Sequence, residues 1–391
     1  MNAPWSRVFE FSQRTRLLLG SGVWLKAVAE ARAFGDRVLL VTGVTSLTRL
    51  GLQPLLEAEA ARLGLGLCRF VVPREPDVEL ADLAGALARS NGVSAVLGIG
   101  GGSTLDVAKA AAALATNPGS ARDYLEGLPG PGPKALLAAP LPVVCVPTTA
   151  GTGSEVTKNA VLQVADLQVK RSMRSELLFP HSAFIDPVLS GQAPLGVRAG
   201  TGFDALTHLI EAFCSTNASP FSDALAKDGI SRAIHALQSL ADGSAGAADA
   251  HDLAIASTLG GICLANAGLG AAHGLIAPLG GLYPNIPHGA GLACLLPATL
   301  AINAAAAADT APAAHARLGE LWRILAVDSA SEAVHQLSAL RVKLGLPALV
   351  DYGPIDVGRV IKSPSGSLKT NPVPLGETEL RALLEFALSG R

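Results

Sequence analysis

The first half of the chain alternates apolar, strand-like runs with helical stretches, and this alternation limits the fold more than any other feature. Strands are predicted at residues 14–19, 37–42, 67–72, 93–99 and 141–146, and helices at 23–33, 52–63 and 78–90. The run 37–42 is almost wholly apolar, as is typical of a strand covered by helices on both faces. The β-α-β-α-β order predicts a parallel sheet.

From about Pro194 the strand signals fade, and alanine-rich helical stretches follow to the C-terminus. The predicted helices are 204–213, 223–240, 252–267, 292–308, 313–325, 331–344 and 377–388. Hydrophobic residues make up 49% of the chain, and much of this share is alanine, which suits closely packed helices. The sequence therefore predicts an α/β plus all-α protein, with a parallel-sheet, Rossmann-like domain at 1–187 and an all-helical domain at 188–391.

A glycine-rich segment, Gly100-Gly101-Gly102-Ser103-Thr104-Leu105-Asp106-Val107-Ala108-Lys109, follows a predicted strand and opens a helix. Glycines there let the backbone approach a phosphate, and a helix N-terminus offers free N–H groups and a positive dipole. The order differs from the G-x-G-x-x-G dinucleotide fingerprint. A plain glycine turn capped by Ser103 is an equally good interpretation of this segment alone.

A second loop of small residues, Pro147-Thr148-Thr149-Ala150-Gly151-Thr152-Gly153-Ser154-Glu155, follows the next predicted strand. Hydroxyl groups and glycines suit a loop that touches a cofactor, although a plain turn has the same composition. Ligands gather at the carboxyl ends of parallel strands, so two such loops after successive strands favour a nucleotide site.

Asp204 and His208 are spaced i and i+4 in a predicted helix, so they lie on one helical face. That face is apolar, and polar groups on it need a partner. His273 and His288 follow later in the chain. One carboxylate and three imidazoles would suit Zn²⁺ or Fe²⁺, with Mn²⁺, Co²⁺ and Ni²⁺ also compatible. Taken singly, each of these residues would pass for an ordinary buried or loop residue.

Composition and charge disfavour several other classes of protein. The 391 residues carry 30 Lys and Arg against 32 Asp and Glu, so no basic surplus indicates a nucleic-acid partner. Residues 1–11 lack the apolar core of a secretory signal, and no run of membrane-spanning length is expected. The cysteines lack C-x-x-C spacing and lie in apolar contexts, which predicts reduced core thiols in a cytoplasmic protein. The expected partner is a small molecule.

Together these motifs resemble the iron-containing, or group III, alcohol dehydrogenase family over nearly the whole chain. The resemblance is carried by the strand 37–42 with the glycine after it, the two loops described above, the Asp-x-x-x-His pair and the later histidines. A terminal segment, Lys369-Thr370-Asn371-Pro372, is similar to the Asn-Pro loop of that family. The resemblance implies an N-terminal nucleotide-binding domain, a C-terminal metal-binding domain and a homodimer or larger homo-oligomer.

The resemblance also implies a role for individual residues. The metal ligands would be Asp204, His208, His273 and His288. The cofactor, NAD or NADP, would be bound by Gly43, Gly101, Gly102, Ser103, Asp106, Thr148, Thr149, Thr152, Asn159 and Lys170. The implied reaction passes a hydride between the nicotinamide and an alcohol or aldehyde substrate, with the metal, Fe²⁺ or Zn²⁺, acting on the substrate oxygen.

The chain departs from the family pattern at three places. Ala277 stands where many members have a histidine, so a second imidazole for proton relay is missing or supplied elsewhere. The interval from His273 to His288 is one residue longer than expected, and Gly43 stands where NAD-preferring members have an acid. The glycine, with Thr45, Ser46 and Arg49 nearby, predicts that NADP(H) is accepted at least comparably with NAD(H).

Other functions remain open at this point. A maleylacetate-type reductase would need a basic residue such as Arg171, Arg174 or Lys369 to pair with the substrate carboxylate. A sugar-phosphate cyclase, a lyase with the same two-domain plan, would need several basic residues in the helical domain, and this chain has few. A nucleotide-binding protein that has lost catalysis is disfavoured by the complete set of four ligands.

Overall fold

The computed structural model describes residues 8–390, and they form two compact units. The α/β unit comprises Gln13–Thr149 and Gly153–Ala193. The helical unit comprises Pro194 onward, together with the N-terminal segment that ends at Ser12 and the short stretch Ala150–Thr152. The structure thus changes unit at Pro194 rather than at the predicted boundary after 187, because helix α6 (Pro187–Gly191) packs with the sheet unit. The expectation about residues 1–11 lies partly outside the described residues.

The α/β unit is built on a six-stranded sheet in the order β1-β8-β5-β4-β2-β3, with every recorded pairing parallel. The strands are β1 (Arg16–Leu19), β2 (Arg37–Gly43), β3 (Gly66–Val72), β4 (Ala95–Gly100), β5 (Val143–Pro147) and β8 (Ser182–Ile185). All six residues of β4 are buried, which explains why its sequence is continuously apolar. The predicted parallel sheet is confirmed.

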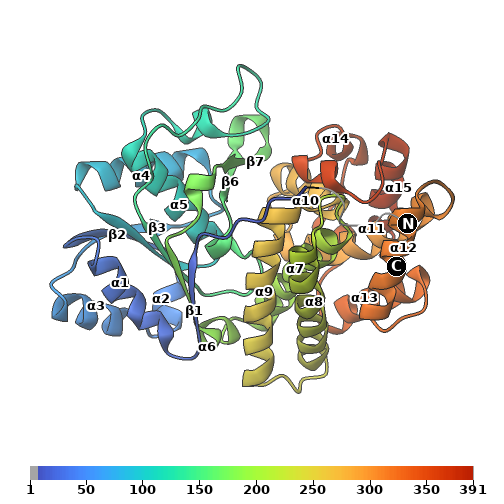
Figure 1. Ribbon diagram of the computed structural model, residues 1–391, viewed down its shortest axis with the longest axis horizontal. Helices are drawn as coiled ribbons and strands as arrows, with labels where there is room; N and C mark the ends of the chain where they lie inside the picture. The colour runs from blue at the N-terminus through green and yellow to red at the C-terminus, as the bar shows by residue number, and fades with distance from the viewer. Residues whose placement is uncertain (1–7, 391) are drawn as a thin grey trace. The chain divides into compact units, whose positions relative to one another are not determined.

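Helices cover both faces of this sheet, as Figure 1 shows. They are α1 (Lys26–Arg32), α2 (Ser46–Arg49), α3 (Gln53–Arg62), α4 (Val78–Ser90) and α5 (Gly102–Thr116). Leu97 and Ile99 of β4 share a core with α1 and α3. Gly98 lies between them in the strand and faces α5: a Cβ built on Gly98 would lie 3.1 Å from side-chain atoms of both Ala108 and Leu105. The period-2 alternation of a strand therefore places the two helical layers on opposite faces.

Strand β8 and the short helices α2 and α6 were not predicted, and neither was a further part of the α/β unit. An antiparallel hairpin, β6 (Asn159–Val164) and β7 (Val169–Arg174), forms a separate two-stranded sheet. Its β7 strand reads Val-Lys-Arg-Ser-Met-Arg, in which four of the six residues are polar, so the sequence carries no strand signal of its own. Burial of Ala160, Leu162 and Met173 against α5 stabilises the hairpin.

The helical unit contains α7 (Leu195–Cys214), α8 (Pro220–Ala241), α9 (Ala247–Ala267), α10 (Ala271–Leu282), α11 (His288–Thr310), α12 (Pro312–Ile324), α13 (Ala330–Lys343), α14 (Val357–Ile361) and α15 (Glu377–Leu388). Every helix predicted after Pro194 is present, and the predicted α/β plus all-α class is confirmed. Helices α7 and α11 begin earlier than predicted, and α10 was not predicted, because Pro278 and several glycines obscure its helical pattern.

Helix α11 is the most apolar long helix of the unit. By length and composition it could cross a membrane, with a mean hydropathy of 1.7, so the expectation that no run reaches such a length is wrong. However, 72% of that stretch is buried inside the protein, as expected of a core helix. Leu292, Leu295 and Leu296 are fully buried and contribute to the two hydrophobic cores that flank α11.

Candidate metal centre and cofactor loops

Two of the predicted metal ligands lie on α7, as their spacing requires. Asp204 and His208 are both buried, with 2% and 4% of their surface exposed. The Nδ1 atom of His208 lies 3.5 Å from Asp204 Oδ1. Helix α7 can carry two polar groups on a buried face because the neighbouring positions, Ala205, Leu206 and Leu209, supply the apolar packing.

The third and fourth histidines are brought to α7 by two helix starts. Helix α9 ends at Ala267, the next residue, Gly268, has a φ of 72°, and the chain turns by 100° into α10. His273 is therefore in the first turn of α10, and His288 is the first residue of α11. The start of α11 touches α7 closely: a Cβ on Gly289 would lie 2.0 Å from the carbonyl oxygen of Gly200. This backbone contact, which only glycine permits, places His288 beside Asp204.

The three predicted histidine ligands converge on one carboxylate oxygen of the fourth ligand, Asp204. Asp204 Oδ1 lies 3.3 Å from His273 Nε2, 3.5 Å from His208 Nδ1 and 3.8 Å from His288 Nε2. Ligand atoms of Asp204, His273 and His288 all lie within 4.8 Å of one another, a spacing that one metal ion can bridge. His208 lies outside this group of three, but its ring stacks on that of His273 with centroids 4.3 Å apart.

These residues fit a divalent metal. The Nδ1 atom of His208 is buried and makes no hydrogen bond, an arrangement that costs free energy unless another partner binds it. The set of one carboxylate and three imidazoles is chemically suited to Zn²⁺ or Fe²⁺. Among the described residues, no lysine or arginine forms an ion pair with Asp204 that would compete with a metal.

The pKa values of the cluster reflect its burial and its charges. Burial opposes ionisation of Asp204, but the adjacent imidazoles hold the pKa of that carboxyl well below its usual range. Burial lowers the pKa of His208 to about 3. Burial also disfavours a charged His273, yet hydrogen bonds with Asp204 and Glu211 raise its pKa to about 9. The cluster therefore combines one firmly ionised ligand with one histidine held neutral.

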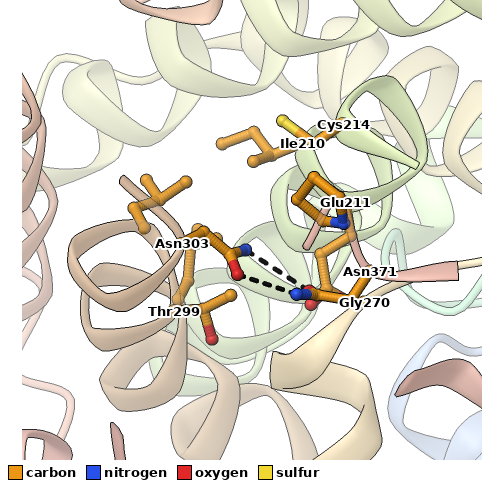
Figure 2. Close-up of a pocket in the computed structure, with 10 residues that line it drawn as sticks. Ile210, Glu211, Cys214, Gly270, Thr299, Asn303 and Asn371 are labelled. Atoms are coloured by element: carbon orange, nitrogen blue, oxygen red, sulfur yellow. Dashed lines mark hydrogen bonds between the residues drawn. The ribbon is translucent and has the colours of Figure 1, made fainter. Parts of the chain in front are cut away.

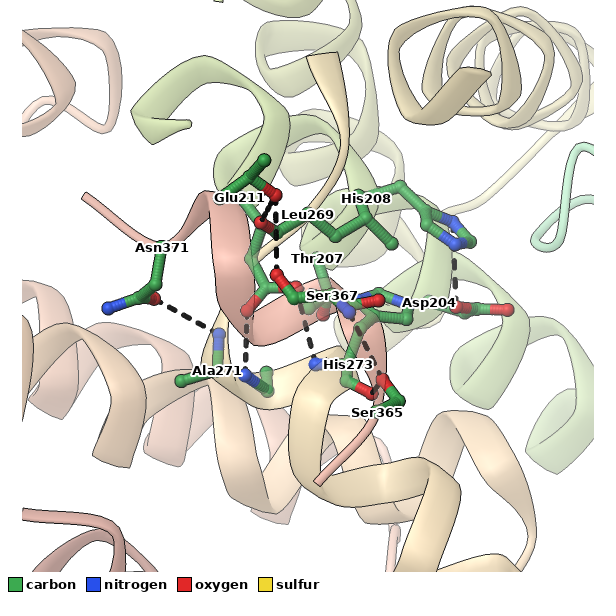
Figure 3. Close-up of polar contacts among 12 residues, drawn as sticks. Asp204, Thr207, His208, Glu211, Leu269, Ala271, His273, Ser365, Ser367 and Asn371 are labelled. Atoms are coloured by element: carbon green, nitrogen blue, oxygen red, sulfur yellow. Dashed lines mark hydrogen bonds and ion pairs between the residues drawn. The ribbon is translucent and has the colours of Figure 1, made fainter. Parts of the chain in front are cut away.

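Sequence reasoning missed Glu211, which lies one turn beyond His208 on α7. Figure 3 shows its side chain hydrogen-bonded to the first turn of α10, which contains His273. Its Oε2 atom lies 2.7 Å from His273 Nδ1, and its Oε1 atom accepts a hydrogen bond of 2.7 Å from the Ala272 N–H. The signal was available, because positions 204, 208 and 211 form an i, i+4, i+7 stripe of polar residues on a buried helix.

The segment around Asn371 also supports the start of α10. The side-chain oxygen of Asn371 accepts from the Ala271 N–H at 3.0 Å, and its amide donates to Asn303 at 2.7 Å. Figure 2 shows this amide pair lining a small cavity that Glu211 also borders. Ser365 donates to the His273 carbonyl oxygen at 3.2 Å. The Asn-Pro segment singled out in the sequence therefore supports the helix that carries His273, a predicted metal ligand.

The first residues of the two predicted cofactor loops lie side by side in the α/β unit. They follow β4 and β5, which are neighbours in the sheet, and the Thr148 N–H donates to the Gly100 carbonyl oxygen at 2.9 Å. Gly101 precedes α5, and Gly102 and Ser103 form its first turn. A Cβ on Gly101 would lie 3.2 Å from Thr149 Oγ1. The N-terminus of α5 is thus at the carboxyl end of the sheet, where parallel sheets bind nucleotides.

Asp106 and Asn159 make contacts within the α/β unit. Asp106 accepts hydrogen bonds from Ser154 Oγ at 2.5 Å and from the Val161 N–H at 2.9 Å. The buried Lys109 lies 3.2 Å from Asp106 and donates to the carbonyl oxygens of Ser154 and Asn159. These contacts fasten the second loop to α5, so Asp106 has a structural role in addition to its predicted cofactor contact, which stays a prediction.

The remaining predicted cofactor residues are more scattered. Gly43 is the last residue of β2, at the carboxyl end of the sheet. Lys170 lies on β7, and its ammonium group pairs with Glu75 at 2.7 Å. Thr152 belongs to the helical unit, in which Gly151 packs against Thr201. Cofactor contacts of these three residues stay predictions.

Comparison with known proteins agrees with this description. Residues 14–187 match the family model for iron-containing alcohol dehydrogenase, and residues 198–356 match that for the C-terminal part of the Fe-containing alcohol dehydrogenase family. Long-chain-alcohol dehydrogenase 1 of Geobacillus thermodenitrificans is 34% identical over 382 residues, which is 95% of each chain. A 4-hydroxybutyrate dehydrogenase of Cupriavidus necator is 33% identical over 81% of this chain and 83% of its own length.

A solved structure shows the same fold. The iron-containing alcohol dehydrogenase of Thermococcus thioreducens superimposes with a TM-score of 0.85 at 26% identity, covering 98% of this chain and all of that one. The match extends over both units, and the donors of the Asp204 cluster suit a divalent metal such as iron. The chain therefore belongs to the iron-containing alcohol dehydrogenase family.

Proposed function

We propose that the protein is a metal-dependent alcohol dehydrogenase or aldehyde reductase that uses NAD(H) or NADP(H). The convergence of His208, His273 and His288 on Asp204 Oδ1 carries this proposal. When bound, a divalent metal supplies Lewis acidity toward the substrate oxygen, and the nicotinamide supplies or accepts the hydride.

The protein's own groups hold and orient these components. Asp204 contributes the negative charge of the metal site, and the three imidazoles contribute neutral nitrogen donors. Gly101, Gly102 and Ser103 present the start of α5 to a pyrophosphate. Ala277, one turn after His273 on α10, has no group that can carry a proton, so proton transfer must depend on water or on another residue.

The substrate class is proposed from the relatives. Two similar enzymes are named for long-chain alcohols and for 4-hydroxybutyrate, and the hydroxyl group of 4-hydroxybutyrate is that of a primary alcohol. We propose a primary alcohol or its aldehyde for this enzyme as well. Arg174, considered above for a substrate carboxylate, pairs instead with Glu126 at 3.3 Å.

The cyclase alternative is disfavoured by three basic residues of the helical unit that are already paired with carboxylates: Lys227 with Glu320, Arg232 with Asp252 and Arg317 with Asp223. A phosphate pocket needs basic groups that are available to the phosphate. We also propose that the protein is cytoplasmic and assembles as a homodimer or larger homo-oligomer, in keeping with the family resemblance.

The direct test is a panel of alcohols and aldehydes assayed with metal-free protein, to which Fe²⁺, Zn²⁺, Mn²⁺, Co²⁺ or Ni²⁺ is returned singly. Reduced nicotinamide absorbance reports turnover. We expect activity only with metal, and a loss of at least about 100-fold in the His273→Ala variant, because three ligands hold the ion less firmly than four.

Two controls separate metal loss from general damage. The exposed His315 provides a matched variant, His315→Ala, which should retain activity. NADPH affinity of His273→Ala, followed by nucleotide fluorescence, should stay within about threefold of the wild type, since the glycine loop lies in the α/β unit. Full activity with a chelator present throughout would contradict the metal mechanism.

A further inference from the structure

Glu211 is a buried carboxylate whose hydrogen-bond donors all belong to one helix start. Its surface is 3% exposed. Oε1 accepts from the Ala272 N–H, and Oε2 accepts from the His273 N–H at 3.3 Å and from the His273 ring at 2.7 Å. Among the described residues no lysine or arginine contacts Glu211, and the cavity beside it is lined by uncharged residues (Figure 2).

These contacts determine which nitrogen of His273 carries a proton. A backbone N–H can only donate, so both carboxylate oxygens act as acceptors, as in an ionised carboxylate. The third donor must then be Nδ1–H of His273. With Nδ1–H held by Glu211, Nε2 is the nitrogen that faces Asp204, 3.3 Å away, and it is the one that loses its proton when a metal binds.

The same contacts restrict the orientation of the ring. One carboxylate oxygen of Glu211 accepts from both the backbone N–H and the ring of His273, so neither group can move without breaking its hydrogen bond to Glu211 (Figure 3). The ring of His273 is also restrained by stacking on the ring of His208, and the two ring planes are inclined by 20°. Gly270 permits the approach, because a Cβ there would lie 2.9 Å from Glu211 Oε1.

We propose that Glu211 is a positioning residue of the metal centre: it holds His273 in the Nδ1–H tautomer and presents Nε2 to the metal. The inference rests on the proposed metal site. A carboxylate that accepts from the non-ligating nitrogen also increases the basicity of the ligating one, and loss of such a partner reduces metal affinity about 10- to 100-fold.

The test compares Glu211→Gln with a matched control on the same helix start. In Glu211→Gln the amide NH₂ would face N–H donors, and donation from it to Nδ1 would move the ring proton to Nε2. The control is Asn371→Ala, which removes the hydrogen bond to the Ala271 N–H but touches no histidine. Both variants weaken the start of α10, and only the first changes the environment of the imidazole.

Zn²⁺ affinity of the metal-free protein is measured by competition with a chromophoric chelator, and urea unfolding of the same samples gives the loss of stability. We expect Glu211→Gln to weaken Zn²⁺ binding by about 10- to 100-fold and Asn371→Ala by less than about threefold. The visible spectrum of the Co²⁺-loaded protein should change in Glu211→Gln alone, because it reports the ligand geometry.

Other results of these measurements would contradict the role of Glu211 or the metal site. Equal weakening in both variants would show that Glu211 acts only through helix α10, and unchanged Zn²⁺ binding in Glu211→Gln would overturn the proposal outright. A wild-type protein that binds no Zn²⁺, Co²⁺ or Fe²⁺ would refute the metal site itself. Should Glu211→Gln fail to fold, Glu211→Asp carries the test: it keeps the charge, shortens the reach by one methylene, and should lose Zn²⁺ affinity to an intermediate extent.

Discussion

At residue 43 we expect the cofactor preference to depend on a single missing side chain. An acid at the end of β2 would accept hydrogen bonds from the 2′-hydroxyl of NAD and repel the 2′-phosphate of NADP. A Cβ on Gly43 would lie 2.8 Å from Ser46 Oγ, a hydroxyl that can rotate away. We expect Gly43→Asp to shift the ratio of kcat/KM values toward NAD by at least about tenfold.

Gly43→Asn is the matched control, since it adds the same bulk without the charge. Steady-state kinetics with both cofactors measure the shift. If Asn and Asp change the preference equally, crowding rather than charge decides it. If the wild type does not accept NADP(H) at all, the argument from Gly43 is wrong.

Ala277 is the second position where we expect a single residue to affect the reaction, through its proton transfer. It is partly exposed on α10, four residues after His273, so a longer side chain has room on that face. We expect Ala277→His to add an ionisation in the range of an ordinary imidazole, near pH 6.5, to the pH profile of kcat. Ala277→Gln supplies similar bulk without a titrating group. Identical profiles for both variants would place the relay elsewhere.

At the scale of elements, the metal site depends on how closely α11 approaches α7. Gly289→Ala would place a methyl group 2.0 Å from the Gly200 carbonyl oxygen, so the two helices must separate. We expect a loss of about 1–3 kcal/mol in the free energy of unfolding, as for an overpacked core, together with weaker metal binding because His288 moves with α11.

Gly319, inside α12, provides the comparison. A Cβ there meets nothing within 4 Å, so Gly319→Ala should stabilise the protein by about 0.5–1 kcal/mol and leave metal affinity unchanged. Urea unfolding and metal titration of both variants test the contrast. Normal metal affinity in a destabilised Gly289→Ala protein would separate the helix contact from the placement of His288.

At the scale of the whole molecule, pH should act in opposite directions on the metal-free and the metal-loaded protein. The pKa of His273 is raised to about 9, so in metal-free protein its proton stabilises the fold below pH 6.5, and that stability is lost as pH rises through 9. A bound metal requires the unprotonated ring, so metal affinity increases over the same range.

Thermal unfolding between pH 7 and 9.5 tests this expectation. The melting temperature of metal-free protein should fall, and the difference between metal-loaded and metal-free protein should widen. In acid, the pKa of His208, lowered to about 3 by burial, means that stability is lost as pH falls below 6.5. Parallel curves for the two forms would show that His273 does not exchange a proton for the metal.

The sequence predicted the layers of the molecule well because burial on both faces requires apolar runs. Strands β2 and β4 and helices α8, α9 and α13 could be recognised from their composition and periodicity. The hairpin β6–β7 and helix α10 could not, since polar residues, glycines and Pro278 mask their patterns. Their conformations depend on packing against α5 and on the polar contacts made by Glu211 and Asn371.

By itself, the sequence determined the two-part architecture and the family resemblance, and it predicted the four polar residues of the candidate metal site. Local spacing sufficed for Asp204 and His208, because a helix places i and i+4 together whatever surrounds it. Only the tertiary structure decided that His273 and His288 join them, since their positions follow from a 100° turn between helices and from the contact of Gly200 with Gly289. It also decided the role of Glu211. The role of a buried carboxylate depends on the donors that the fold brings to it, and the donors of Glu211 lie about 60 residues away in the chain.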